Sequence, residues 1–512
     1  MNDSTLNVSN VRYPLMVSGA LIFIYLLIRA VRLPMTCDEV QTCLAFSRYS
    51  VPEIMTYSRS AIPNNHIFHT LLVKLFTNIF GMKLLVTRLP NLLGFITYYY
   101  FCCRLVLEFT SKPVEGLSKF GYWASVIIPM LILVANPYLL DFFSLARGYG
   151  LACGLMMGSV YYALCYCEES SQRFLFLSLL LGALAVYANL TVLNYFVALW
   201  VLLLMSIGYS TLALREDRKM GTSRIDYTYR EMWIHFGMTV GIGLVLAAAL
   251  YLPIVRMRET NQFVFWGSKG FYQDTFVTLV NGLAYHGDYF HADPTPYICG
   301  LILVLLFVCV CFAGVLFGQY RLGSLYLPPM FMFGLLFGSI VVNILQHWLV
   351  GTLYLQTRTA LFFFPLGALV ISQLIGTLMG SGARIVTIPC YVIGMAVFLH
   401  LVFSMNLKSC WEWWYDMDTR EVLNYLEDQY KQDPQKKKIK LATNDLMQPS
   451  FWFHVSEEGR EPWVNIPAWD NHVQKDSTID YYYTFASEYG ELKGEYDMVK
   501  DYGGRFLLRR RR

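Results

Sequence analysis

The stretch LMVSGALIFIYLLIRAVRLPMTCDEVQTC, residues 15–43, decides the fold class. Its first part is almost entirely apolar and close to the length of about 20 residues that crosses the hydrocarbon of a bilayer. Its second part holds two adjacent carboxylates, Asp38 and Glu39, where the chain leaves that span. An acid pair at this place indicates either the start of a helix, which acidic residues favour, or a functional site at the membrane surface.

The composition of the whole chain extends this interpretation. Of the 512 residues, 56% are hydrophobic and 15% are charged, and the mean hydropathy is +0.42. These values exclude an ordinary soluble globular protein of this size. The net charge of +4 is small, and the final RRRR is a short terminal cluster, so the sequence predicts no nucleic-acid binding.

Apolar runs of spanning length recur along the chain, and we expect a polytopic α-helical membrane protein. Eleven transmembrane helices are predicted, over residues 14–31, 89–107, 120–137, 149–166, 174–189, 191–209, 232–253, 297–317, 325–346, 360–379 and 385–404. The segment 64–81 is apolar but carries polar residues on one helical face. These are His66, His69, Lys74 and Asn78. The pattern favours an amphipathic helix that lies in the interface.

Basic residues set the sides of the membrane. With segment 64–81 lying flat, the loop 210–231 is cytoplasmic, and its basic residues agree with the positive-inside rule. They are Arg215, Arg218, Lys219, Arg224 and Arg230. A transmembrane domain over 1–405 then places loops 32–88 and 254–296 on the extracytoplasmic face, together with the tail 406–512.

The tail 406–512 is long enough for a small domain, and we expect it to be α/β. Residues 418–430 have helical periodicity with Asp418 at the predicted cap, and 437–445, 478–487 and 504–511 are typical of strands. The preceding segment CWEWWYD, 410–416, favours an aromatic belt at the membrane surface, with sugar stacking as the alternative.

Candidate site residues gather at the outer ends of the predicted spans. Beyond the acid pair they are His66, Arg88, Asp141, Arg147, Tyr149, Tyr354 and Arg358. Arginine suits an anionic phosphate through paired hydrogen bonds, and a nearby carboxylate can accept a proton from an attacking hydroxyl. Taken singly, each arginine could instead extend along the apolar surface to reach the interface, or pair with an acid.

The order of these motifs resembles the GT-C membrane glycosyltransferases, in the branch of protein O-mannosyltransferases and aminoarabinose transferases. The acid pair is followed by IPNNHIFHTLLVKLF (62–76), TRLPNLLGFITYYY (87–100), NPYLLDFFSLARGYGLA (136–152) and LYLQTRTALFFFPL (353–366). His66 stands near the family's His-Pro-Pro position, although here the order is Pro63, Asn64, Asn65, His66.

The resemblance implies an integral membrane glycosyltransferase with an active site on the extracytoplasmic face. It implies a polyprenyl-phosphate sugar donor, inverting transfer to a glycan, lipid or protein acceptor, and a place in the bacterial inner membrane among its lipids. It implies Asp38 as general base with Glu39 as its neighbour, and Arg147 and Arg358 as contacts to the lipid phosphate. The sugar stays open.

Two other functions stay open beside this one. A transporter or flippase would use the same arginines to hold an anionic lipid without chemistry. Transporters are typically built from repeats around a midplane site, whereas these polar residues gather at one face. A non-catalytic assembly subunit is the third hypothesis.

Cysteine and metal chemistry are weakly indicated. Cys37 and Cys43 flank the acid pair and could form a disulfide, which their spacing does not decide. No cofactor is required by the sequence, and a divalent metal ion stays open. Residues 285–294 place His286, Asp288, His291 and Asp293 close together, but a solvated loop is favoured there over a metal site.

Overall fold

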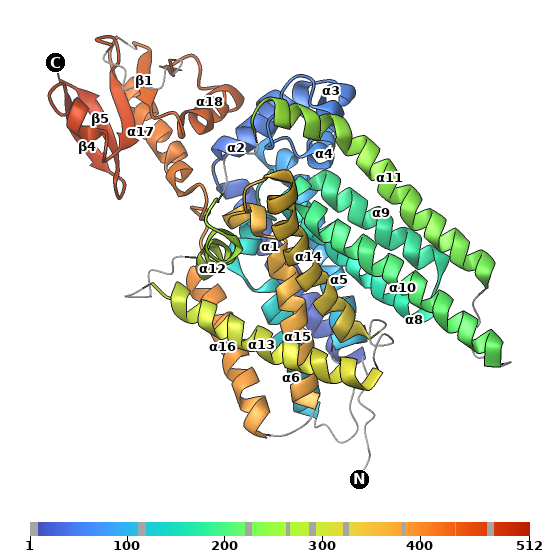
Figure 1. Ribbon diagram of the computed structural model, residues 1–512. Helices are drawn as coiled ribbons and strands as arrows, with labels where there is room; N and C mark the ends of the chain where they lie inside the picture. The colour runs from blue at the N-terminus through green and yellow to red at the C-terminus, as the bar shows by residue number, and fades with distance from the viewer. Residues whose placement is uncertain are drawn as a thin grey trace.

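The computed structural model describes residues 9–110, 119–220, 228–262, 267–285, 293–320, 327–380, 384–435, 437–467 and 476–511. A bundle of long helices makes up most of the molecule, and a small sheet with its own helices lies at one end (Figure 1). The chain is a polytopic α-helical membrane protein with a small C-terminal α/β unit, as its sequence predicts.

Each of the eleven predicted spans coincides with a helix. Eight described helices are long and apolar enough to cross a membrane: α1 (Ser9–Arg32), α5 (Leu84–Leu105), α8 (Tyr149–Glu169), α10 (Leu193–Met220), α11 (Tyr229–Glu259), α13 (Thr295–Tyr320), α14 (Pro328–Val350) and α16 (Arg384–Ser404). Shorter apolar helices occupy the other three positions: α6 (Lys119–Val134), α9 (Gln172–Ala188) and α15 (Phe363–Gly380).

The segment predicted to lie in the interface forms a helix of its own, α4 (Ile67–Phe80). Its last two turns expose Leu75, Ile79 and Phe80, while its first turns are buried. Figure 1 shows α4 at the same end of the bundle as α2 (Cys37–Val40) and α3 (Val51–Thr56). Apolar side chains that point away from the protein at one end of a helical bundle suit the membrane interface.

Short helical segments connect the long ones at this end. They are the π-helical Gln41–Ala45, the 3-10 turns Phe46–Arg48, Leu190–Val192, Thr357–Ala360 and Trp414–Asp416, α7 (Pro137–Asp141), the π-helical Phe271–Val277 and α12 (Thr278–Ala284). The π-helical Val106–Thr110 extends α5 at its other end. Irregular backbone therefore gathers where the candidate residues lie.

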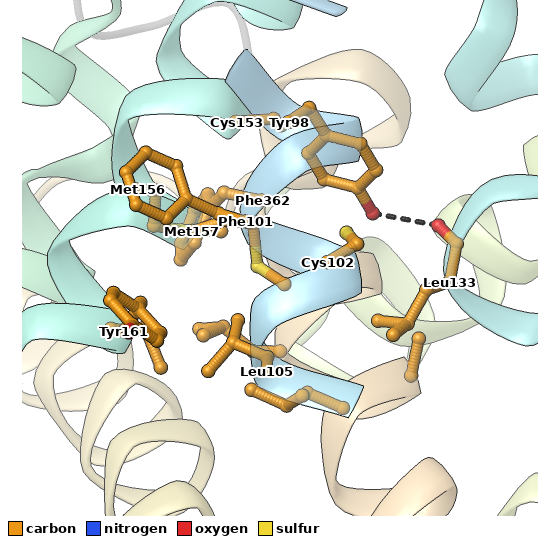
Figure 2. Packing of buried hydrophobic residues seen from close by; sticks show 14 of the residues in the cluster. Tyr98, Phe101, Cys102, Leu105, Leu133, Cys153, Met156, Met157, Tyr161 and Phe362 are labelled. Carbon is orange, nitrogen blue, oxygen red and sulfur yellow. Dashed lines mark hydrogen bonds between the residues drawn. The ribbon is translucent and has the colours of Figure 1, made fainter. Parts of the chain in front are cut away.

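The core between α5, α6 and α8 holds these helices close together. Figure 2 shows Tyr98 of α5 donating its hydroxyl hydrogen bond to the Leu133 carbonyl of α6, at 2.7 Å. A side chain at Gly154 of α8 would collide with the Gly94 carbonyl of α5. Small residues allow such close helix contact in membranes, so the positions of α5 and α8 relative to each other are tightly fixed.

The C-terminal unit is a mixed five-stranded sheet in the order β2-β1-β3-β5-β4. Strand β1 pairs in parallel with β2 and β3, and β5 pairs antiparallel with β3 and β4. The elements are α17 (Thr419–Gln432), β1 (Ile439–Thr443), α18 (Gln448–Glu457), β2 (Val464–Asn465), β3 (Tyr481–Phe485), α19 (Tyr489–Leu492), β4 (Tyr496–Asp501) and β5 (Arg505–Arg510). The predicted helix and three strands are confirmed.

One detail of this unit differs from its prediction. Asp418 occupies the N-cap position of α17, but its side chain makes no capping hydrogen bond. It accepts instead from the Arg505 guanidinium at 2.7 Å and from the Tyr483 hydroxyl at 3.0 Å. The Asp418 carboxylate therefore binds the buried Arg505 of β5 rather than the main-chain N–H groups at the start of α17.

Candidate active site

The loop after α1 is shaped by a capping box. Thr36 is the N-cap of α2: its side chain accepts from the Glu39 N–H at 3.4 Å, and the Glu39 carboxylate accepts from the Thr36 N–H at 2.9 Å. These bonds satisfy main-chain donors at the helix start. Of the two adjacent acids, Glu39 therefore serves in the capping box as its N3 residue, and the Asp38 side chain is left for other partners.

Glu39 is also the partner of a buried arginine. Arg88 of α5 donates to both carboxylate oxygens, at 2.8 and 2.7 Å, and neither side chain is exposed. The same guanidinium donates to three carbonyls at the end of α1 and just beyond it. The Ala146 N–H donates to Glu39 as well. These two predicted site residues thus tie α1, α5 and the loop before α8 together.

The turn that carries Arg147 is held by a second residue of α5. The Asn91 side-chain amide donates to two carbonyls of this turn, one of them that of Arg147, and its oxygen accepts from the Leu151 N–H at 2.9 Å. Gly148 is required next, because any side chain there would collide with the Ala188 carbonyl. The motif TRLPN therefore positions the motif SLARGYG.

Asp38 lies at the meeting point of three loops. One oxygen accepts from the Asn64 side-chain amide at 3.0 Å. The other lies 3.2 Å from the Arg358 guanidinium and 3.5 Å from that of Arg147. Arg147 also donates to the Asn64 side-chain oxygen at 2.6 Å, which fixes the amide. Residues far apart in the sequence thus converge on one carboxylate.

The charges around Asp38 keep it ionised. Burial alone would raise the pKa of this carboxyl, but Arg147, Arg358 and the Asn64 amide outweigh burial and hold the pKa below its usual 3.8. At neutral pH the site therefore holds a carboxylate and two guanidinium groups in contact.

A second carboxylate completes the cluster. Arg358 donates to Glu412 at 2.8 Å, and the Tyr138 hydroxyl donates to the other Glu412 oxygen. The Arg358 guanidinium lies 4.9 Å from the centre of the Trp413 ring, a cation–π contact. Glu412 and Trp413 belong to the segment predicted as an aromatic belt. For Trp413, which is 3% exposed, that prediction is wrong, because its ring packs in the core beside Arg358.

A cavity of about 370 Å³ adjoins Arg358. Its lining includes His66, Tyr149, Asn189 and Asn194, all buried, and the His66 ring lies edge-on to the Tyr149 ring with centres 5.1 Å apart. Burial, with the charge of Arg147 next in size, holds the pKa of His66 well below 6.5, so the imidazole is neutral. This volume falls in the range of small-molecule pockets, about 300–1,000 Å³.

Besides Glu39 and Arg88, two predicted residues lie apart from this cluster. Asp141 is buried and accepts from Arg29 of α1, from the Tyr285 hydroxyl and from the Trp411 N–H. Tyr354 forms an isolated strand-like bridge with Gly267. These contacts connect loops and span ends. His66, Tyr149 and Arg358 line the cavity, and Asp38 and Arg147 contact its lining residues Arg358 and Asn64.

The C-terminal unit contacts the backbone just before Asp38. The Met35 N–H donates to Nε2 of His454 on α18 at 3.0 Å, and the Cys37 N–H donates to Asp416 at 3.0 Å. Since Nε2 accepts, the His454 proton sits on Nδ1, which faces Glu458 at 2.8 Å. Burial lowers the pKa of His454 in agreement with this neutral form. The unit therefore helps to fix the loop that carries Asp38.

The described residues bear on both the metal and the disulfide predictions. Within the described ranges, no three His, Cys, Asp or Glu side chains are grouped closely enough to hold a metal ion. His286, Asp288 and His291 of the weakly indicated cluster lie outside those ranges, and only Asp293 lies inside. Cys37 and Cys43 are both free thiols, so they do not form a disulfide with each other.

Several residues of the site are not among those that the sequence predicts. Asn64 and Asn91 stood inside quoted motifs, and their buried amide partners could have been suspected from those positions. Glu412 lies in a tryptophan-rich segment, whose aromatic residues suggest a membrane belt rather than a site. Asn189 and Asn194 flank a short turn between two spans. Their roles depend on tertiary contacts that no local pattern encodes.

The chain was compared with known proteins. No family model and no curated protein matches it. Among solved structures it is similar to ArnT, an aminoarabinose transferase, from Cupriavidus metallidurans, bound to undecaprenyl phosphate, with 12% identity, 98% of each chain covered and a TM-score of 0.42. The apo state of that protein gives 0.41 at the same identity and coverage.

A third similar structure is the arabinosyltransferase EmbB from Mycobacterium smegmatis. The two chains are 14% identical, and the match covers 76% of this chain and 40% of the EmbB chain with a TM-score of 0.36. Both named proteins are glycosyltransferases of the kind that the motifs resemble. The function proposed for this chain comes from the geometry of its own site.

Proposed function

We propose that the chain is an integral membrane glycosyltransferase that moves a sugar from a polyprenyl-phosphate donor to an acceptor hydroxyl. The observation that carries the proposal is Asp38, an ionised carboxylate held by two guanidinium groups at one end of a membrane helix bundle, next to a cavity. A base and phosphate-binding cations in contact are what transfer from a sugar phosphate requires.

The proposed reaction is a single displacement with inversion. The acceptor oxygen forms a bond to the anomeric carbon, and its proton passes to the Asp38 carboxylate. The bond between the anomeric carbon and the phosphate oxygen breaks, and its electron pair stays on that oxygen. Polyprenyl phosphate leaves with one more negative charge than it carried in the donor, and the guanidinium groups stabilise that charge.

The two arginines differ in what they can reach. The Arg358 side chain is 29% exposed, whereas that of Arg147 is fully enclosed. Arg358 is therefore the cation that binds the departing phosphate directly. Arg147 keeps its contacts to Asp38 and Asn64 and acts as a positioning residue whose charge remains beside the site.

The order of the spans supports a reaction on the extracytoplasmic face. Asp38 follows α1, Arg147 precedes α8, Arg358 precedes α15 and Glu412 follows α16, so these four span ends meet at one end of the bundle. The end of α10 and the start of α11 belong to the other end, and the basic residues of 210–231 lie around this connection, which supports an extracytoplasmic site under the positive-inside rule. The motif resemblance supports a bacterial inner membrane and a glycan, lipid or protein acceptor.

The test is a transfer assay with the purified full chain in lipid nanodiscs. Polyprenyl-phosphate donors that carry labelled glucose, mannose or arabinofuranose are incubated with acceptor-containing membranes, using wild type, Asp38→Asn and Asp497→Asn. Asp497 is an exposed carboxylate on β4 that pairs with Arg511, so it controls for the substitution itself. We expect Asp38→Asn to lower the rate by about 10²- to 10⁴-fold, the usual contribution of a general base.

Two results decide the proposal. The proposal is supported if wild type and Asp497→Asn transfer sugar and Asp38→Asn does not, provided that Asp38→Asn elutes and melts like wild type. Donor binding without transfer by any of the three proteins, combined with movement of the lipid between leaflets, overturns it in favour of a lipid carrier.

A further inference from the structure

The cavity beside Arg358 is lined almost entirely by uncharged polar and apolar groups. The polar side chains include three buried residues on separate elements: His66 before α4, Asn189 after α9 and Asn194 in α10. Among the described residues that line it, Arg358 is the only formally charged one, and none is a carboxylate. Asp38 contacts Arg358 but is not among the lining residues, and the two guanidinium groups balance its charge.

Each of these three residues holds a polar atom without a partner. Asn189 uses its oxygen to accept from the N–H and hydroxyl of Thr191, which leaves its amide hydrogens unpaired. Asn194 donates to the Thr191 carbonyl, which leaves its oxygen unpaired. Nε2 of His66 also has no partner. A buried polar atom left unpaired costs about 1–3 kcal/mol, so a ligand is favoured if small movements of these side chains let it pair with them.

We propose that this cavity binds the sugar of the donor and selects an uncharged, hydroxyl-bearing ring over an amino sugar or a uronic acid. A hydroxyl group both donates and accepts hydrogen bonds. It therefore suits the Asn189 amide, which donates, the Asn194 oxygen, which accepts, and the His66 imidazole. An ammonium group would meet no carboxylate among the lining residues and would lie near the cation Arg358. The carboxylate of a uronic acid would compete with the donor phosphate for that same cation.

The inference rests on the proposed function, because the cavity is assigned to the donor through Arg358, which both lines it and touches Asp38. The phosphate at Arg358 places the attached sugar in the adjoining space. The inference goes further by naming the class of sugar, which the motif resemblance leaves open.

The experiment measures donor binding rather than transfer. Full-length protein in nanodiscs is titrated with unmodified polyprenyl phosphate and with the same lipid carrying glucose, 4-amino-4-deoxyarabinose or galacturonic acid. We expect wild type to bind the glucose donor at least about 10-fold more tightly than either charged donor. A wild type that binds the amino-sugar donor as tightly as the glucose donor overturns the inference.

A charge-adding variant sharpens the test. Asn194→Asp places a carboxylate in the cavity with almost no change of shape and should shift the preference toward the amino-sugar donor by about 10-fold or more. Asn343→Asp is the matched control: Asn343 of α14 is also buried with an unpaired side-chain oxygen, but it does not line the cavity. No shift in Asn194→Asp protein that folds, or an equal shift in the control, overturns the inference.

The outcomes also separate the inference from the proposed function. Binding that prefers the neutral donor, with no transfer by any variant, refutes the enzyme but supports the sugar site. Transfer that runs fastest with the amino-sugar donor supports the enzyme and refutes the sugar site. If Asn194→Asp changes only the KM for the acceptor, the assignment of the cavity to the donor is wrong.

Discussion

The adjacent acids Asp38 and Glu39 should give opposite phenotypes when each is converted to its amide. Glu39 is fully buried, its carboxylate accepts from two nitrogens of Arg88, and it also accepts from two main-chain N–H groups. Glu39→Gln keeps the shape but leaves the Arg88 charge buried without its counter-ion. Breaking a buried ion pair in this way costs about 3–5 kcal/mol.

This cost should appear as lost thermal stability. At about 1 °C per kcal/mol for a protein of this size, the midpoint of unfolding in detergent should fall by roughly 3–5 °C. Asp38→Asn should leave the midpoint near that of wild type and remove transfer. The assay is size-exclusion chromatography after heating, with the transfer rate measured on the folded fraction.

The chain offers a matched control in Glu53. It is the N3 residue of another capping box, with Ser50 as the cap, but it is partly exposed and lies 3.9 Å from the solvent-exposed Arg59. Glu53→Gln should therefore change the melting midpoint far less than Glu39→Gln does. If folded Glu39→Gln melts like wild type yet transfers no sugar, Glu39 takes part in the chemistry and its assignment as a structural residue is wrong.

Two further predictions concern pH and the C-terminal unit. The pKa of Asp38 is held below 3.8 and that of His66 well below 6.5, so neither group should contribute an inflection to kcat/KM between about pH 5 and 8. An inflection near pH 6.5 that disappears in His66→Gln would contradict this. His454→Ala leaves the Met35 N–H unpaired and should lower the transfer rate about 10- to 100-fold without weakening donor binding. His454→Gln can accept the same hydrogen bond and should keep most of the wild-type rate. Initial rates at saturating donor test both variants.

The sequence predicted most of the fold because its strongest signals are local. Apolar runs of spanning length locate the membrane helices, and polar residues at helical spacing identify α4 as a helix with one polar side. The helix and strands of the C-terminal unit also follow from periodicity. The position of β4 and the register of the sheet depend on pairing between distant segments, which periodicity does not show.

The site was predictable as a set of residues but not as a set of roles. Adjacent residues such as Asp38 and Glu39 look alike in the sequence, and only the position of Arg88 separates them. Asp141 likewise looks like a site residue in the sequence, yet in the structure it forms an ion pair with Arg29 of α1. A buried ion pair and a functional carboxylate cannot be distinguished until the neighbours in space are known.

Four charged side chains meet at the site: Asp38, Glu412, Arg147 and Arg358. Their arrangement offers a way for the Asp38 carboxylate to be stable in the free protein and still act as a base. In the free protein Arg358 is shared between Asp38 and Glu412, and its charge helps to keep the pKa of Asp38 low, which makes the carboxylate a weak base. A donor phosphate competes for the same guanidinium. When Arg358 turns to the phosphate, Asp38 loses one cation while Arg147 remains, so its pKa rises toward a value better suited to accepting a proton. Under the proposed function, binding of the donor phosphate would thereby strengthen the base beside the sugar that is to be transferred.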